Sequence, residues 1–127
     1  MRAAITARLR AVRTAVTFRT TVAAYPELGG KLSLYLYVRE PSCLRARMFS
    51  PLAGTPEDPA TGSAATPLAG FLLRLEGGES ATYEIHQGVE MGRPSLLLAS
   101  ARRGPDGIRA RVGGGCVPVM QGSVQLD

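Results

Sequence analysis

The chain lacks several residue types that would define its function. It has no tryptophan and no asparagine, and its 127 residues include one histidine, one lysine and two cysteines. Without asparagine there is no N-glycosylation sequence, and no histidine or cysteine spacing matches a zinc site. The apolar runs have the length of a strand, far short of the ~20 residues that cross a bilayer. These absences argue against a metal centre and against a membrane protein.

Both cysteines, Cys43 and Cys116, lie beside strand-like residues and are far apart in the sequence. We expect them to be small buried side chains rather than a disulfide or a nucleophile. A reducing, cytoplasmic location fits this use of cysteine.

Positive charge dominates, with fifteen basic against ten acidic residues and a net charge of +5. Such a balance is typical of proteins that bind nucleic acid or an acidic membrane surface. Here the arginines are mostly spread singly and the few aromatic residues are not interleaved with them, so a base-stacking surface is not supported. We therefore interpret the arginines, Arg45 and Arg47 among them, as solvated surface charge and expect no nucleic-acid partner.

The first 26 residues contain five arginines and no acidic residue. That composition is typical of a mitochondrial transit peptide. The alternative is an ordinary amphipathic helix, followed by a β-branched strand from Val16 to Val22. One helical face would carry Ile5, Leu9, Val12 and Val16. We prefer this alternative because no small-residue cleavage pattern stands out.

The remainder of the chain predicts one helix among many strands. The helix is expected from about Gly62 to Leu75, with Gly77 and Gly78 ending it and a local distortion at Pro67. Segment 50–59 holds three prolines and is expected to be a restricted loop. Strands are predicted at 32–38, 44–49, 82–87, 95–101, 108–112 and 117–126. The short, regular turn spacing indicates antiparallel pairing, so residues 1–127 are expected to form a single α+β domain.

The segment from Glu57 to Ala65 is the most informative part of the chain. It places an acid, a proline-shaped turn and a Gly-Ser pair immediately before the helix. In such a turn several backbone N–H groups point at one place, at the positive end of a helix. Carboxylates and phosphates bind in that geometry. The alternative is a capped helix start in which Thr61 or Ser63 only satisfies the first amides. The local pattern alone favours the cap.

A second segment, Gln87 to Ser95, also admits two interpretations. Arg93 pairs with a substrate anion in the first. In the second, Gly88, Gly92 and Pro94 shape a turn between strands and Arg93 bonds carbonyls across it. We prefer the second, because glycine and proline at this spacing are typical of turns.

Taken together, Arg47–Pro51, Glu57–Ala65 and Gln87–Ser95 closely resemble the signatures of the phenazine-biosynthesis PhzF-like family, and Arg111–Gly122 resembles the family's end. The motifs occur in the family's order and spacing over residues 30–127. The family has the diaminopimelate epimerase-like fold, in which each of two halves is a barrel-like antiparallel β-sheet wrapped around one central α-helix. This chain resembles the carboxy-terminal half only.

The resemblance implies a cofactor-free isomerase that moves a proton between carbons of a small cyclic carboxylate. Asp58 matches the family's acid in this half and Ser63 matches its active-site serine, so both are expected to be catalytic. The residues expected to bind the substrate are Thr61, Gly62, Ser63 and Ala64. A glutamate and a glycine-histidine pair of the other half have no match here, and His86 is not that histidine.

Three hypotheses follow from a resemblance to one half. In the first, an isomerase-family chain is completed by a separate amino-terminal half, and the site lies in the cleft between the two. In the second, the chain is a non-catalytic, anion-binding relic that lacks the catalytic glutamate. In the third, two copies form the cleft as a homodimer. The isomerase expects a small carboxylate as substrate, the relic expects a small anion, and no hypothesis expects a cofactor or a metal.

Overall fold

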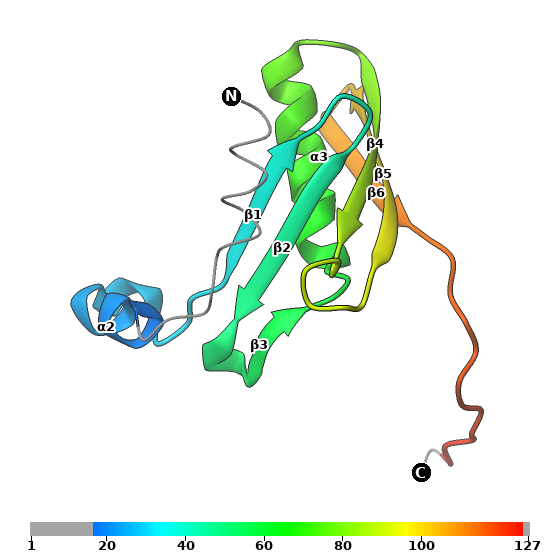
Figure 1. The fold of residues 1–127 in the computed structure, drawn as a ribbon. Helices are drawn as coiled ribbons and strands as arrows, with labels where there is room; N and C mark the ends of the chain where they lie inside the picture. The colour runs from blue at the N-terminus through cyan, green and yellow to red at the C-terminus, as the bar shows by residue number, and fades with distance from the viewer. Residues whose placement is uncertain (1–16, 126–127) are drawn as a thin grey trace.

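A computed structural model describes residues 17–125 of the chain (Figure 1). Its elements are α2 (Thr17–Ala24), the 3-10 turn η1 (Pro26–Leu28), β1 (Leu34–Arg39), β2 (Leu44–Ser50), η2 (Pro51–Ala53), β3 (Thr55–Asp58), α3 (Gly62–Glu76), β4 (Ser80–Gln87), β5 (Ser95–Gly104) and β6 (Gly107–Gly113). The helix predicted before Val16 lies outside the described residues.

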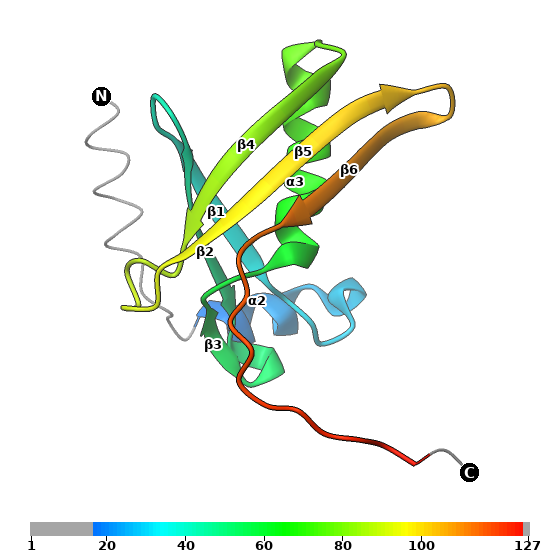
Figure 2. The same ribbon diagram turned by 90° about the vertical axis from the view of Figure 1, so that its right-hand side faces the viewer.

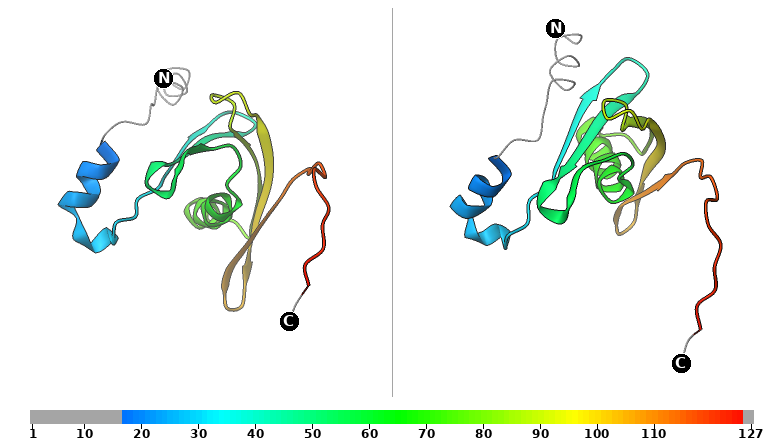
Figure 3. Two further views of the ribbon diagram at one scale, coloured as in Figure 1. Left: turned by 90° about the horizontal axis from the view of Figure 1, so that it is seen from below. Right: turned by 60° about the horizontal axis from the view of Figure 1, so that its bottom comes forward.

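The strands form a six-stranded sheet in the order β1-β2-β4-β5-β6, and β3 pairs with β2 beside this row. The sheet curves around α3, which lies in its concave side (Figures 2 and 3). It stays open, because β1 and β6 are its two edges. The predicted class, an α+β fold with a sheet wrapped around one helix, is therefore confirmed.

One strand pair departs from the expected antiparallel pattern, because β2 and β4 run parallel. The other neighbouring pairs are antiparallel. Parallel strands need a long crossover connection, usually a helix. Here β3 and α3 make that crossover, so the helix that fills the sheet also sets the direction of β4.

Small side chains allow α3 to lie close to the sheet. The core consists of Leu44, Ala46, Ala65, Leu68, Ala69, Leu72, Leu73, Tyr83, Ile85, Leu97, Ala99 and Ala101. Ala65 and Ala69 on the helix are fully buried, as is Ala46 on β2. A Cβ placed on Gly70 would lie 3.6 Å from a methyl group of Ile108. Burial of this apolar surface is the main driving force for forming the layer.

Both predicted ends of α3 are confirmed to within a residue. Gly77 ends the helix in the left-handed conformation, with φ of 78°, and its N–H bonds the Leu73 carbonyl. The helix continues unbroken through Pro67. The hydroxyl of Thr66 donates to the Gly62 carbonyl at 2.9 Å in this turn. The distortion expected at Pro67 therefore does not interrupt the helix.

The strand predicted from Val16 to Val22 is wrong, because Thr17–Ala24 is the helix α2. β-Branched residues prefer strands mainly where they pack on a neighbouring strand, and no strand among the described residues pairs with this segment. α2 instead contacts η1 and η2. It buries Phe18, which is 8% exposed.

The strand predicted at 117–126 is also wrong over its described part. Residues 114–125 have no regular structure and lead away from the sheet (Figure 1). Val117 and Val119 are each 84% exposed and Met120 is 93% exposed. A strand needs a neighbour to pair with, and the glycines at 113–115 carry the chain away from the free edge of β6.

A short strand, β3, was missed inside the predicted loop 50–59. It pairs with β2 only through Met48↔Asp58 and Ser50↔Thr55, and the register shifts between them. Pro56 is tolerated because an irregular edge pairing does not need every backbone N–H.

The cysteine prediction is partly wrong. Both cysteines are free, but Cys43 is half-buried and Cys116 is exposed on the unpaired segment. Burial, followed by the hydrogen bond with Glu40, raises the pKa of the Cys43 thiol, which disfavours a reactive thiolate.

Among the described residues, neither α2 nor α3 combines the length and the apolar character that a membrane-spanning helix requires.

Replacing Leu72 by alanine tests the packing of α3. Leu72 is 2% exposed, whereas Leu75 on the same helix is 65% exposed. We expect Leu72→Ala to lower the free energy of unfolding by about 2–5 kcal/mol, because it leaves a cavity. The control Leu75→Ala is expected to change it by about 0.5 kcal/mol or less. Urea unfolding followed by circular dichroism measures both, and equal losses would contradict the packing.

Candidate functional site

The carboxyl ends of β3 and β4 meet along one edge of β2. Asp58 of β3 lies opposite Met48, and Gln87 of β4 lies opposite Ala46, two residues away. Because β3 runs against β2 and β4 runs with it, the two strands approach each other end to end. This topology brings Asp58 and Gln87, which are 29 residues apart, into contact.

Gln87 is completely buried and joins the two strand ends to the start of α3. Its Nε2 donates to the Asp58 carbonyl oxygen at 2.7 Å and to Thr61 Oγ1 at 2.8 Å. Its Oε1 accepts from the Thr61 N–H at 3.3 Å and from the Tyr35 hydroxyl at 3.0 Å. Burial, and then the charge of Asp58, raise the pKa of Tyr35 to about 12. The Tyr35 hydroxyl therefore remains a donor at neutral pH.

A buried ion pair fixes β3 on β2. The Arg47 guanidinium donates to both carboxylate oxygens of Glu57, each at 2.8 Å. Their side chains are 7% and 13% exposed, and Arg47 also lies over the Phe49 ring at 4.7 Å. Bidentate pairs of this kind are directional as well as strong. Glu57 immediately precedes Asp58, so this pair sets the position of the turn.

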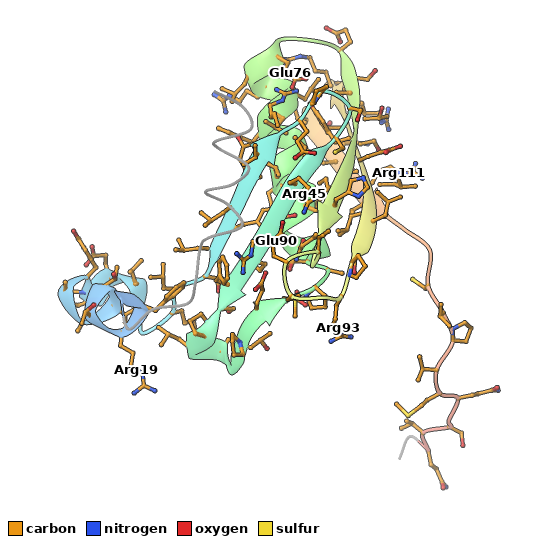
Figure 4. The ribbon with its side chains drawn as sticks, viewed as in Figure 1. Arg19, Arg45, Glu76, Glu90, Arg93 and Arg111 are labelled. Atoms are coloured by element: carbon orange, nitrogen blue, oxygen red, sulfur yellow. The ribbon has the colours of Figure 1, made fainter. Side chains whose placement is uncertain are left out.

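A second ion pair fixes the turn that follows β4. Arg45 Nη2 lies 2.6 Å from Glu90 Oε1, and the two side chains are 16% and 8% exposed. They come from β2 and from the turn, and face each other in Figure 4. Burial alone would raise the pKa of Glu90, but the hydrogen bond and the charge of Arg45 lower it. The interpretation of Arg45 and Arg47 as solvated surface charge is therefore wrong.

The turn at 88–93 is shaped as the second interpretation expected. Gly88 and Gly92 have φ of 75° and 77°, and the Arg93 N–H bonds the Gly88 carbonyl at 2.9 Å. The main chain of Arg93, rather than its side chain, makes this bond. The side chain is exposed and projects away from the sheet (Figure 4).

The amino-terminal end of α3 is not capped by a side chain. Thr61 occupies the cap position, but its hydroxyl makes no capping bond and donates to Asp58 Oδ2 at 2.6 Å. The Thr61 amide is taken by Gln87, and the Ala64 amide bonds the Thr61 carbonyl at 3.2 Å. Within residues 17–125, the amides of Gly62 and Ser63 have no hydrogen-bond partner. The capped start favoured by the local pattern is wrong.

The predicted site residues therefore lie together, in different environments. Asp58 and Ala64 are half-buried, Thr61 is 7% exposed, and Ser63 is exposed. No acidic residue occupies the first turn of α3, so the helix dipole there is not neutralised by the helix's own side chains. The open N–H groups of Gly62 and Ser63 can donate hydrogen bonds to a carboxylate, and the neighbouring Asp58 carboxyl can accept a hydrogen bond from a donor group beside it.

Gln87 and Tyr35 were missed as parts of the site. One signal was available, because Tyr83, Ile85 and Gln87 alternate along β4 and all three are buried. A glutamine at the last inward position of a strand is a buried polar group that must find partners. The sequence does not say which partners these are.

A cavity of about 660 Å³ lies elsewhere, over β4, β5 and β6, where Glu84, Leu98 and Arg111 are among its lining residues. Neither Asp58 nor Ser63 lines it. Because Ser63 is exposed, the candidate site is open to the surface at this residue.

Comparison with known proteins identifies relatives. The family model described as phenazine biosynthesis-like protein, PhzC-PhzF, matches residues 17–122. A trans-2,3-dihydro-3-hydroxyanthranilate isomerase of Pseudomonas chlororaphis is 49% identical over 86 residues, which are 65% of this chain and 30% of the relative. An uncharacterized isomerase of Mesorhizobium japonicum is 41% identical over 101 residues, covering 72% of this chain and 33% of the relative.

A solved structure shares the fold. It is a phenazine biosynthesis protein of the PhzF family from Bacillus anthracis, with a TM-score of 0.60 and 19% identity, over 70% of this chain and 33% of that chain. The chain thus matches about a third of the length of its relatives.

Replacing Gly88 by alanine tests how the turn after β4 supports the site. A Cβ there would overlap the Arg93 carbonyl oxygen and lie 2.9 Å from the Pro59 carbonyl oxygen. Gly92 has a similar φ but nothing within 4 Å of its Cβ position, so Gly92→Ala is the matched control. Both variants incur a left-handed backbone cost of about 1–2 kcal/mol. We expect Gly88→Ala to lower the free energy of unfolding by at least about 2 kcal/mol more than Gly92→Ala does, as measured by urea unfolding. Equal losses would show that the turn is not packed closely against Pro59.

Proposed function

The chain belongs to the phenazine biosynthesis-like, PhzF-type family of isomerases, and on that premise we propose that its Asp58–Ser63 turn holds the carboxylate of a small cyclic acid during a cofactor-independent proton transfer. The ligand class is taken from the relatives' name, trans-2,3-dihydro-3-hydroxyanthranilate isomerase. A cytoplasmic setting is part of the same proposal.

The observation that carries the proposal is the pair of open amides at the start of α3. The N–H groups of Gly62 and Ser63 have no partner within residues 17–125, and they begin a helix of 15 residues. The end of such a helix carries about half a positive elementary charge. Two aligned donors in a positive field favour a carboxylate, and the exposed Ser63 hydroxyl supplies a third donor.

The same donors favour the proton transfer itself. Removing a proton from the carbon next to a carboxylate places negative charge on the carboxylate oxygens as an enolate develops. Donors already aligned with those oxygens stabilise that charge without rearrangement. We assign this role to Gly62 and Ser63, and assign to Asp58 a hydrogen bond or a proton relay to the ring substituent beside the carboxylate.

A second chain is part of the proposal. The chain matches about a third of its relatives' length, and the family's catalytic glutamate has no match in it. The apolar side chains at 117–124 are exposed on an extended segment with no pairing among the described residues. An unpaired segment of this kind can add to the sheet of another protein. We propose an amino-terminal half as that partner, with a homodimer as the alternative.

The competing function is a binding domain that keeps the anion turn but performs no reaction. The absence of a matching glutamate favours it for this chain in isolation. The two functions share the binding step and differ in proton exchange, so they are separated by two different measurements.

Replacing Ser63 by glutamine tests the binding step. Anthranilate, a stable aromatic analogue of the named substrate, is titrated into labelled protein and amide shifts are recorded by NMR. In the parent chain we expect the largest shifts at Gly62 and Ser63. A bulky side chain at position 63 blocks the approach, so Ser63→Gln is expected to weaken binding by about 10-fold or more while the rest of the spectrum is retained. Ser42→Gln, at another exposed serine, serves as control; unchanged affinity in Ser63→Gln would remove the site.

Incubation in deuterated water tests the reaction. The chain is supplied with trans-2,3-dihydro-3-hydroxyanthranilate, alone and with the amino-terminal half of the Pseudomonas chlororaphis relative, and deuterium uptake is measured by mass spectrometry. We expect uptake only in the mixture, because the second half supplies the base. Uptake by the chain alone would favour the homodimer, and no uptake in either sample, with anthranilate binding intact, would leave the binding domain.

A further inference from the structure

The Gln87 side chain makes four hydrogen bonds. Two of its partners can act only as acceptor or only as donor, and they determine the direction of the bonds. The Asp58 carbonyl oxygen can only accept, so the group 2.7 Å from it must be the amide nitrogen Nε2. The Thr61 backbone N–H can only donate, so the group 3.3 Å from it must be Oε1. The oxygen and the nitrogen of the Gln87 amide are therefore distinguished by their hydrogen-bond partners, and the side chain has one possible orientation.

The orientation of Gln87 then determines that of the Thr61 hydroxyl. Nε2 donates to Thr61 Oγ1 at 2.8 Å, and a hydroxyl has a single proton to give. The remaining close neighbour of Oγ1 is Asp58 Oδ2, at 2.6 Å. Thr61 therefore donates to Oδ2, and Oδ2 is kept as an acceptor.

The second oxygen of Asp58 is in a different position. Oδ1 has no hydrogen-bond partner within residues 17–125. It is also not among the buried polar atoms that lack a partner, so it is open to the surroundings. One carboxyl group thus has a committed oxygen and an available one.

We infer that Gln87 is a positioning residue which, through Thr61, holds Asp58 Oδ2 as a hydrogen-bond acceptor and leaves Oδ1 as the oxygen that exchanges a proton with a bound molecule. Oδ1 takes a proton from the bound molecule, so that Asp58 becomes a carboxylic acid, and it returns that proton to the bound molecule, so that Asp58 is again a carboxylate. The Thr61 hydrogen bond stabilises the charge that then spreads to Oδ2. The nature of the bound molecule rests on the proposed function, but the direction of the hydrogen bonds does not.

The substitution Asp58→Asn tests this inference, because it introduces side-chain amide protons whose exchange with solvent can be measured. Asparagine has the same shape but one acceptor oxygen and one amide nitrogen. If Thr61 must donate, the asparagine oxygen occupies the Oδ2 position and its nitrogen the open Oδ1 position. We expect the side-chain amide protons introduced at position 58 to exchange with solvent at least about 10-fold faster than those of the buried Gln87, measured by NMR on the ligand-free chain.

A second substitution shows whether Gln87 sets that direction. In Asp58→Asn with Gln87→Met, Thr61 Oγ1 no longer receives a proton from Nε2, so the introduced asparagine amide can turn and donate to it. Exchange of the amide protons at position 58 is then expected to slow several-fold. Thr61→Ser keeps the hydroxyl and Tyr35→Phe keeps the Nε2 bond, so either one combined with Asp58→Asn is expected to leave the fast exchange unchanged.

Two results would overturn the inference: a protected side-chain amide at position 58 beside an intact Gln87, or exchange that Gln87→Met does not alter. If Gln87→Met fails to fold, Asp58→Asn alone decides, because a protected amide at position 58 would show that Thr61 does not donate to that side chain. A purely structural role for Gln87 predicts no change in this exchange. Neither ligand nor turnover is involved, so failure of the anthranilate or deuterium experiments would leave this result standing, and the reverse also holds.

Discussion

The structure depends on one buried amide that joins two strand ends. Where β3 and β4 meet along β2, the regular ladder stops, and a buried backbone group without a partner is costly. Gln87 satisfies the Asp58 carbonyl and the Thr61 N–H with the two ends of a single side chain. The turn between β3 and α3 therefore has a defined shape without regular pairing, and the amides of Gly62 and Ser63 remain available.

Charge on the other face of β2 supports the same junction. Arg45 and Arg47 are two residues apart on one strand, so their side chains share a face. Arg47 pairs with Glu57 of β3, and Arg45 pairs with Glu90 of the turn after β4. Buried ion pairs are weak evidence for net stability, but breaking one is expensive. Here they act as two fixed points that keep the segments before Asp58 and after Gln87 in register with β2.

Several other features leave backbone groups unpaired or apolar side chains exposed. The amides of Gly62 and Ser63 have no partner within residues 17–125, β1 and β6 are the edges of the sheet, and Val117 and Met120 are exposed. The relatives that this chain matches are about three times the matched length. These features support the proposal that a second body completes the site.

Local physics made much of the fold predictable. The bounds of α3 follow from the spacing of its apolar residues and from Gly77, because helix periodicity and a left-handed glycine act over a few residues. Strands β1, β2, β4, β5 and β6 follow from alternation and turn residues. The Asp58–Ser63 turn is contiguous in the sequence, but its local pattern favoured a capped helix start, and it was the order and spacing of the motifs that indicated the family.

Contacts between distant segments decided the rest. The same arginines look solvated in the sequence, and only the packing of β3 and the 88–93 turn against β2 buries Arg45 and Arg47. Residues 17–24 and 117–125 have strand-like composition, but a strand exists only where a neighbour completes its hydrogen bonds. The role of Gln87 arises from its contact with residues 26 and 29 positions earlier. Periodicity and turn chemistry are local and were determined by the sequence, whereas the partners of buried polar groups were decided only by the tertiary structure.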